Sequence, residues 1–182
     1  MVNETYTIEE HQHRLAAWAA SRAASVVAYR FNVKQGVSIL EASGFKAALS
    51  CADQLPLPVD MDRTHAKWRE AIRAAARKEG LSFTHGVAAK LINVYLKVRF
   101  VCAGQHEHVS VRHLHPPIDA TLLKKLGKAN IGGFSRQWRK FQGQRWSKFS
   151  SSRYQSVIDL IRRSLGPGVP LWMIEEHWKG HQ

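Results

Sequence analysis

Cysteine, long apolar runs and acidic residues are all scarce in this chain of 182 residues. Only two cysteines occur, so neither a disulfide framework nor a four-thiolate iron–sulfur cluster is expected, and a reducing cytoplasm fits. No apolar run approaches the roughly 20 residues that span a bilayer. The first residues also lack the basic-then-apolar pattern of a signal peptide. Membrane-spanning and disulfide-rich secreted proteins are therefore disfavoured.

The shortage of acidic residues leaves a large positive charge. There are 27 Lys and Arg against 14 Asp and Glu, which gives a net charge of +13. Such an excess attracts polyanions and repels acidic proteins. Nucleic acid is the first candidate partner and an anionic membrane surface is the second. We expect a DNA-binding protein that is cytoplasmic and associated with the nucleoid.

Helical periodicity dominates the sequence, and hydrophobic residues make up 45%, enough for a core without disulfide or metal staples. We expect an all-α fold, a two-lobed helical bundle in one compact domain (residues 1–182). The expected lobes are 1–60 together with 134–182, and 62–130. A first helix after Thr7 is expected to bury one apolar face, made of Leu15, Trp18, Ala19, Ala23, Val26 and Val27. The further helical segments are expected at 37–49, 64–78, 86–100, 119–127, 135–141, 152–165 and 170–178, with loops at 51–62 and 103–117.

A turn between two expected helices reads His85-Gly86-Val87-Ala88-Ala89-Lys90. Backbone N–H groups at the start of a helix lack helical partners, and the helix dipole is positive there, so this turn predicts a phosphate site. Gly86 has no side chain to keep a DNA backbone away. An ordinary turn between two helices would use a glycine in the same way.

Lys90 is the first candidate for chemistry. In the first turn of a helix a positive charge costs about 0.3–1 kcal/mol, and the same field favours the neutral, nucleophilic amine. Most lysines in so basic a chain must simply be solvated, and that alternative stays open. Asp119, the second candidate, follows Pro116-Pro117 and is expected to cap the next helix. If Asp119 were only a helix cap, its replacement by asparagine would cost little stability.

Taken together, these features resemble the helix-hairpin-helix DNA glycosylases. Gly86-Val87-Ala88-Ala89-Lys90 is similar to the Gly-Val-Gly-x-Lys turn of that superfamily, with Ala88 in place of the second glycine. Pro117-Ile118-Asp119, followed by Leu122 and Leu126, is similar to its Pro-Val-Asp segment. The resemblance covers about residues 65–127 and is nearest to the 8-oxoguanine branch, because the cluster cysteines of the endonuclease III branch are missing. Thr84-His85 replaces the usual Leu-Pro, and the segment between Lys90 and Asp119 is longer than is usual.

The resemblance implies a base-flipping enzyme that needs no cofactor or metal, acting as a monomer on double-stranded DNA with a damaged or modified base. Lys90 would attack the sugar C1′, Asp119 would stabilise the developing positive charge, and a Schiff base would permit strand cleavage. The flipped base would stack on Trp18, Trp138 or Trp146. The DNA backbone would contact the turn residues and a basic group, namely His85, Gly86, Val87, Ala88, Arg136, Arg139, Lys140, Arg145 and Lys148. Repair of oxidised purines and defence against modified phage bases both remain open.

Three alternatives remain. Cys102, His106 and His108 contain metal-binding residue types, although their spacing is not that of a standard zinc site. Arg99 and His106 have the spacing found in all-helical ribonucleases of the HEPN type. A noncatalytic DNA-binding module would keep the turn and need neither Lys90 nor Asp119.

Overall fold

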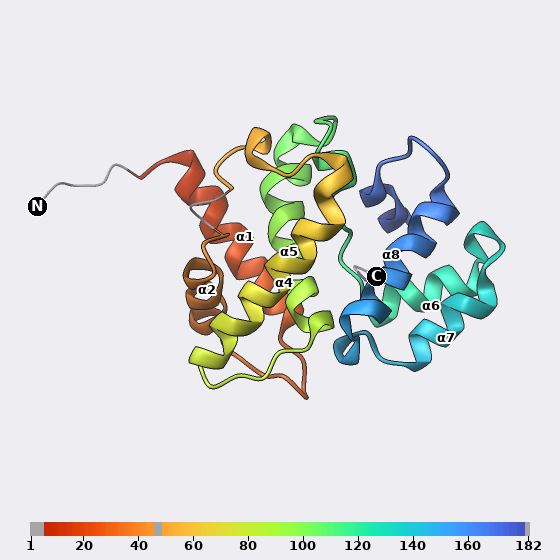
Figure 1. Cartoon of the computed structure of the whole chain (residues 1–182), viewed down its shortest axis with the longest axis horizontal. Coiled ribbons are helices and arrows are strands. Elements are labelled where there is room, and N and C mark those ends of the chain that lie inside the picture. Colours follow the sequence, from red (N-terminus) through yellow and green to blue (C-terminus); the bar gives the residue numbers. More distant parts are fainter. Residues whose placement is uncertain (1–5, 46–48, 181–182) are drawn as a thin grey trace, which may run out of the picture.

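The computed structural model describes residues 6–45 and 49–180, and most of these residues are helical (Figure 1). No β-strand occurs among them; a single isolated bridge pairs Val26 with Tyr29. The expected all-α class is therefore confirmed for the described part of the chain.

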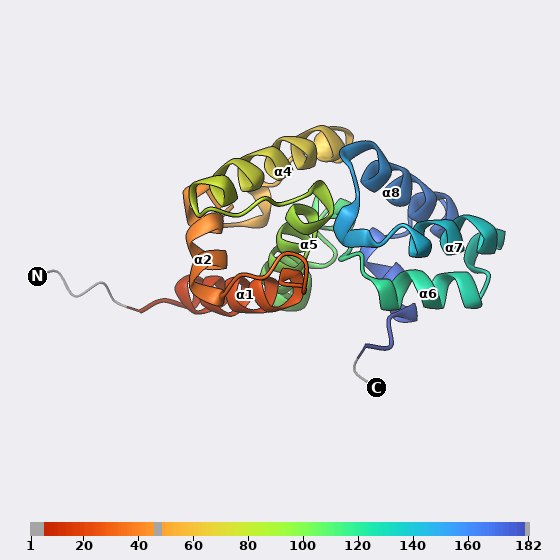
Figure 2. The same ribbon diagram turned by 90° about the horizontal axis from the view of Figure 1, so that it is seen from below.

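The first group of helices surrounds α5 (His85–Leu96). Helices α1 (Ile8–Ala24) and α4 (Met61–Lys78) pack against it, and α2 (Val33–Ala42) contacts both of them. Helix α5 is apolar over most of its length, and ten of its twelve residues are buried, which explains its central position (Figure 2). A π-helix, Lys97–Gln105, continues α5 and ends where Gly104 takes a positive φ of 86°.

Helix α1 buries a different face from the one expected. Its buried apolar residues are four alanines, Ala16, Ala17, Ala20 and Ala24, whereas Leu15 and Trp18 are about half exposed. Small side chains let α1 approach α5 closely, so the larger ones point outward. The start of α1 is as expected, because the Thr7 hydroxyl accepts a hydrogen bond from the Glu10 N–H.

The second group contains α6 (Ala120–Lys128), α7 (Ser135–Gly143), α8 (Ser151–Leu165) and the 3-10 helix η7 (Leu171–His177). Helices α6 and α7 pack against each other, and α8 packs against η7. The short 3-10 helix Trp146–Lys148 and α8 connect this group to α5. The grouping differs from the expected lobes, because α1 and α2 pack with α4 and α5 and not with the C-terminal helices (Figure 2).

Several element bounds also differ from expectation. The segment expected at 37–49 is the helix Val33–Ala42, which ends two residues before Gly44, where φ is 79°. Residues 46–48 of that prediction lie outside the described residues. Helix α4 begins three residues before the expected start at 64. The π-helix extends to residue 105, and a 3-10 turn, Val111–His113, follows, so the expected loop 103–117 is partly helical.

Candidate active site

Lys90 and Asp119, the two predicted catalytic residues, are in direct contact. The Lys90 Nζ donates to Asp119 Oδ2 over 2.9 Å, across a sequence separation of 29 residues. Lys90 is the sixth residue of α5, in its second turn, so the expected place in the first turn is wrong. Only 6% of Lys90 is exposed, because α5 is enclosed by its neighbours. The ammonium group therefore depends on Asp119 for compensation of its charge.

Three donors hold the Asp119 carboxylate in place. Oδ1 accepts the N–H of Leu122 over 2.8 Å, which makes Asp119 the cap of α6 as the sequence predicted. Oδ2 accepts from Lys90 and also from the indole Nε1–H of Trp178, over 2.9 Å. Trp178 follows η7, near the far end of the chain. The carboxylate thus ties α5, α6 and the C-terminal segment together.

Burial and the neighbouring charge shift the pKa values of Lys90 and Asp119 in opposite directions. Burial lowers the pKa of Lys90 below its usual value, although the Asp119 carboxylate opposes the shift. Burial also acts to raise the pKa of Asp119, but the Lys90 ammonium and the N–H groups of Leu122 and Trp178 hold that pKa below its usual value. A lysine that is easier to deprotonate beside a carboxylate that stays ionised is an arrangement suited to amine nucleophiles.

A pocket of about 210 Å³ opens beside the pair. Its apolar wall includes Ala23 of α1 and Val94 of α5, and its polar wall includes Lys97 and Glu175. The Lys97 Nζ donates to Glu175 over 2.5 Å, and burial raises the pKa of Glu175 although Lys97 opposes the shift. The site therefore contains two lysines and two carboxylates whose formal charges cancel.

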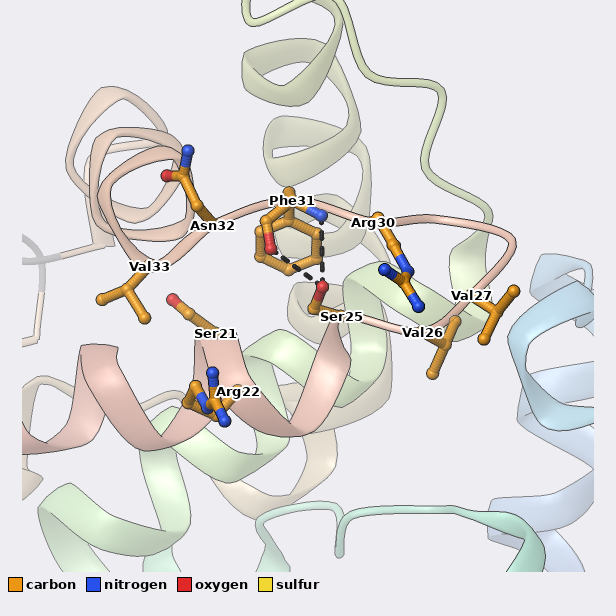
Figure 3. Close-up of a pocket in the computed structure, with 9 residues that line it drawn as sticks. All are labelled: Ser21, Arg22, Ser25, Val26, Val27, Arg30, Phe31, Asn32 and Val33. Carbon is orange, nitrogen blue, oxygen red and sulfur yellow. Dashed lines mark hydrogen bonds between the residues drawn. The ribbon is translucent and has the colours of Figure 1, made fainter.

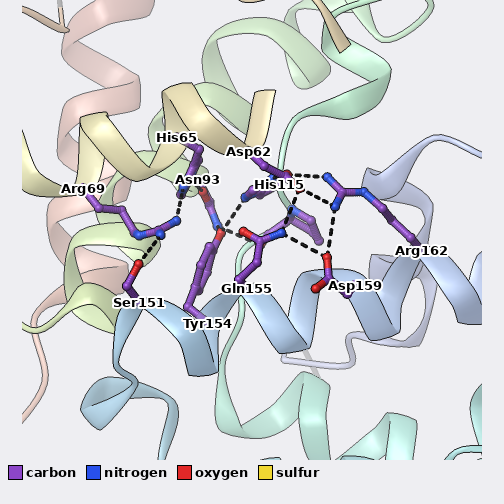
Figure 4. Close-up of polar contacts among 11 residues, drawn as sticks. Asp62, His65, Arg69, Asn93, His115, Ser151, Tyr154, Gln155, Asp159 and Arg162 are labelled. Atoms are coloured by element: carbon purple, nitrogen blue, oxygen red, sulfur yellow. Dashed lines mark hydrogen bonds and ion pairs between the residues drawn. The ribbon is translucent and has the colours of Figure 1, made fainter. Parts of the chain in front are cut away.

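A chain of hydrogen-bonded side chains holds the segment that precedes Asp119 (Figure 4). Arg69 donates to His65 Nδ1, and His65 Nε2 donates to Asn93, each over 2.7 Å. Asn93 donates in turn to the Tyr154 hydroxyl and to the Pro116 carbonyl, each over 2.9 Å. The Asn93 amide therefore holds the backbone three residues before Asp119.

The chain continues on the other side of Tyr154. The Tyr154 hydroxyl donates to His115 Nδ1 over 3.1 Å, and His115 Nε2 donates to Asp62 over 2.8 Å. Arg162 completes it with an ion pair to Asp62 (Figure 4). Both buried histidines are satisfied as neutral rings, and burial lowers the pKa of each. His115 of the histidine-rich segment thus takes part in the packing of α4, α5 and α8.

The turn before α5 does not offer the open phosphate site that we expected. Gly86, Val87 and Ala88 are buried; the Gly86 N–H donates to the Phe149 carbonyl and the Val87 N–H to the Thr84 hydroxyl. A Cβ at Gly86 would lie 2.0 Å from the Trp146 carbonyl oxygen, so a protein backbone occupies the place predicted for DNA. His85 is only 16% exposed and accepts from Arg73. The turn is therefore covered by protein and not open as expected, and contact of these four residues with DNA phosphate stays a prediction.

The three candidate tryptophans have different surroundings. Trp146 is close to the pair, with its ring centroid 5.8 Å from the Lys90 Nζ. Trp138 is fully buried and donates to the Ile131 carbonyl, so its prediction as a stacking platform is wrong. Trp18 is 54% exposed on α1 and does not line the pocket. Trp146 is the one of the three that contacts Lys90.

The predicted basic group lies on α7 and on the turn that follows it. All of its members are exposed, and none is ion-paired with another described residue: Arg136, Arg139, Lys140, Arg145 and Lys148. They remain available to an anionic partner.

The alternative sites find less support in the geometry. The Arg99 guanidinium is buried and donates to the carbonyls of Glu9, Leu49 and Ser50, whereas the His106 side chain is about half exposed. The contacts of Arg99 are those of a structural residue. Within residues 6–45 and 49–180, no group of three His, Cys, Asp or Glu side chains lies close enough to hold a metal. None of the described helices has both the length and the apolar composition to cross a bilayer.

The sequence does not indicate Glu175 and Trp178 as site residues, and it offers Lys97 only as the next candidate nucleophile after Lys90. Lys97 is one of many lysines, and the other two lie more than fifty residues from Asp119 in the chain, so no local pattern indicated them. The sequence matches no known protein-family model, and no curated protein or solved structure is significantly similar to the chain.

Proposed function

We propose that this protein is a DNA glycosylase that excises a damaged or modified base and forms a covalent intermediate through Lys90. The observation that carries the proposal is the buried contact between Lys90 and Asp119 on the wall of a pocket. A pure binding module needs no lysine whose ammonium is buried against a single carboxylate. Such a pair costs desolvation free energy, and function is a reason to retain it.

The proposed reaction begins with the neutral amine of Lys90. Its lone pair forms a bond to the sugar C1′ while the glycosidic C–N bond breaks, and the base leaves with the bonding electrons and takes up a proton. The carboxylate of Asp119 stabilises the positive charge that develops on the sugar. Loss of a proton from the attacking nitrogen and opening of the sugar ring, with a proton added to its oxygen, leave a protonated imine. Removal of a proton from C2′ then expels the 3′ phosphate and nicks the strand.

The charge distribution supports DNA as the substrate. Two long stretches of the chain contain no Asp or Glu, residues 11–40 and residues 120–158. Ala23 in the first stretch lines the pocket, and Trp146 in the second is in contact with Lys90. The reacting pair therefore lies between two basic stretches, a suitable arrangement for a polyanion that passes on both sides. Such an enzyme would work in the cytoplasm, where the nucleoid lies.

The pocket must widen before it can hold a nucleotide. Its volume of about 210 Å³ is below the range of about 300–1,000 Å³ typical of ligand pockets. Trp178 forms part of the wall and donates to Asp119. We propose that movement of this indole opens the pocket and frees one lone pair of Asp119 toward the sugar.

The test is borohydride trapping on duplexes that carry a panel of oxidised, deaminated and alkylated bases or an abasic site. Wild-type protein should form a stable adduct with at least one of them, because borohydride reduces the imine to an amine. Lys90→Gln should form none. Lys124→Gln is the matched control, because Lys124 is an exposed lysine on α6 and its loss should leave trapping unchanged. Equal trapping by wild type and Lys90→Gln would refute the proposal.

A further inference from the structure

A groove of about 920 Å³ lies between the end of α1 and the start of α2 (Figure 3). Its walls come from the last turn of α1, the connecting loop and the first residue of α2. It is far larger than the pocket beside Lys90. Nothing in the proposed chemistry makes use of it.

The groove is basic and has no acidic residue on its walls. Arg22 and Arg30 line it, both are exposed, and neither is ion-paired with another residue in the described part of the chain. Both lie in the stretch 11–40, which contains no Asp or Glu. The local charge therefore favours an anion.

Two further polar side chains of the groove, Ser25 and Asn32, form hydrogen bonds within the loop and with the start of α2. The Ser25 hydroxyl donates to the Phe31 carbonyl and accepts the Phe31 N–H, over 2.8 and 3.1 Å (Figure 3). Asn32 and Gln35 form a reciprocal cap at the start of α2. These bonds fix the shape of the loop and leave the two guanidinium groups as its charged donors. Guanidinium groups bind phosphate oxygens with paired hydrogen bonds.

The groove and the pocket that contains the reacting pair are both lined by residues near the end of α1. Ala23 lines the pocket, and the preceding residue, Arg22, lines the groove. A strand that delivered one nucleotide to Lys90 would carry its neighbouring phosphates past this end of α1. A backbone that followed this end of α1 would therefore reach Arg22 in the groove.

We infer that the Arg22–Arg30 groove binds the phosphodiester backbone of the DNA strand that flanks the reacting nucleotide. The inference rests on the proposed function only in one respect, namely that the bound strand continues from the groove to the nucleotide at Lys90. Its ligand chemistry is the phosphodiester, recognised without regard to base sequence.

The test measures the salt dependence of binding to an undamaged duplex by fluorescence anisotropy. Each phosphate contact contributes about 0.9 to the slope of log affinity against log salt. The double variant Arg22→Gln/Arg30→Gln should therefore lower the slope by about 2. The control is Arg14→Gln/Arg63→Gln, which removes the same charge from two exposed arginines that are ion-paired with Glu10 and Asp60 and do not line the groove. The control slope should stay close to that of wild type.

Equal slopes for the two double variants would overturn the inference, because charge alone would then explain the binding. A groove variant that binds DNA normally but loses affinity for vesicles of anionic lipid would overturn it in favour of a membrane surface. The proposed function has a separate readout. At low salt the groove variant should still trap on damaged DNA, whereas Lys90→Gln should keep the wild-type slope and lose trapping.

Discussion

Replacing Asp119 with asparagine separates its role as a helix cap from its role as the partner of Lys90. The amide keeps one oxygen, which can still accept the Leu122 N–H. Its NH₂ group then faces the Lys90 ammonium and the Trp178 indole N–H, which are both donors. If the amide turns over, the same conflict arises at Leu122. The variant therefore leaves a buried charge without a counterion.

The magnitude follows from the burial of Lys90. Removing one partner of a buried ion pair costs about 3–5 kcal/mol. In a domain of this size a loss of 1 kcal/mol lowers the melting temperature by about 2–4 °C, so the variant should melt about 6–20 °C below wild type at pH 7. Base excision should slow by about 100- to 1000-fold, because one electrostatic contact to the transition state is lost.

The stability loss should depend on pH in a definite direction. Burial already lowers the pKa of Lys90, and loss of the carboxylate lowers that pKa further. The folded variant then binds fewer protons than the unfolded chain, so its stability rises with pH until the pKa of an unfolded lysine near 10.4. The difference in unfolding free energy between wild type and Asp119→Asn should therefore become smaller between pH 7 and pH 10, by at most about 1.4 kcal/mol per pH unit.

Urea unfolding followed by circular dichroism at pH 7 and pH 9.5 measures this effect. Asp159→Asn is the matched control, because Asp159 is exposed on α8 and its change should cost little at either pH. A melting temperature for Asp119→Asn equal to that of wild type at pH 7 would show that the pair is not buried as described. Loss of stability with full excision activity would leave Asp119 as a structural residue only.

Three further predictions concern the surroundings of the pair. Gly86→Ala should cost about 1–3 kcal/mol, because its Cβ would meet the Trp146 carbonyl, whereas Gly143→Ala, with open space around it, should be neutral in the same thermal melt. Trp178→Phe should cost about 1 kcal/mol in urea unfolding, since it removes the N–H that Asp119 accepts; no change in stability would contradict that contact. His65 and His115 have lowered pKa values in the folded state, so stability should be full above about pH 6.5 and fall below it, by up to about 1.4 kcal/mol per pH unit for each ring. A flat profile of unfolding free energy between pH 7.5 and 5.5 would contradict the buried chain.

The sequence predicted well what depends on local chemistry. The caps at Thr7 and Asp119 and the positions of most helices follow from short-range hydrogen bonds and periodicity, and the structure confirms them. The meeting of Lys90 with Asp119 was also predicted, because the resemblance joined two segments that spacing alone could not.

The predictions from the sequence were wrong or missing for features that depend on tertiary packing. Gly86 fits a turn open to DNA as well as it fits a turn covered by another segment, and only the position of residues 146–149 separates the two. The face that α1 buries was predicted from large apolar residues, but close helix packing selected its alanines. Glu175 and Trp178 reach the site because η7 folds back onto it. No sequence pattern near these residues predicts that position.

The proposed reaction attaches the sugar to one particular atom, Lys90 Nζ. Digestion of the borohydride-reduced adduct, followed by peptide mass spectrometry, identifies the modified lysine. We expect modification at Lys90 Nζ and none at Lys97, which lines the same pocket and is paired with Glu175. A sugar attached to Lys97 or to the N-terminal amine, with Lys90 unmodified, would refute the proposed reaction.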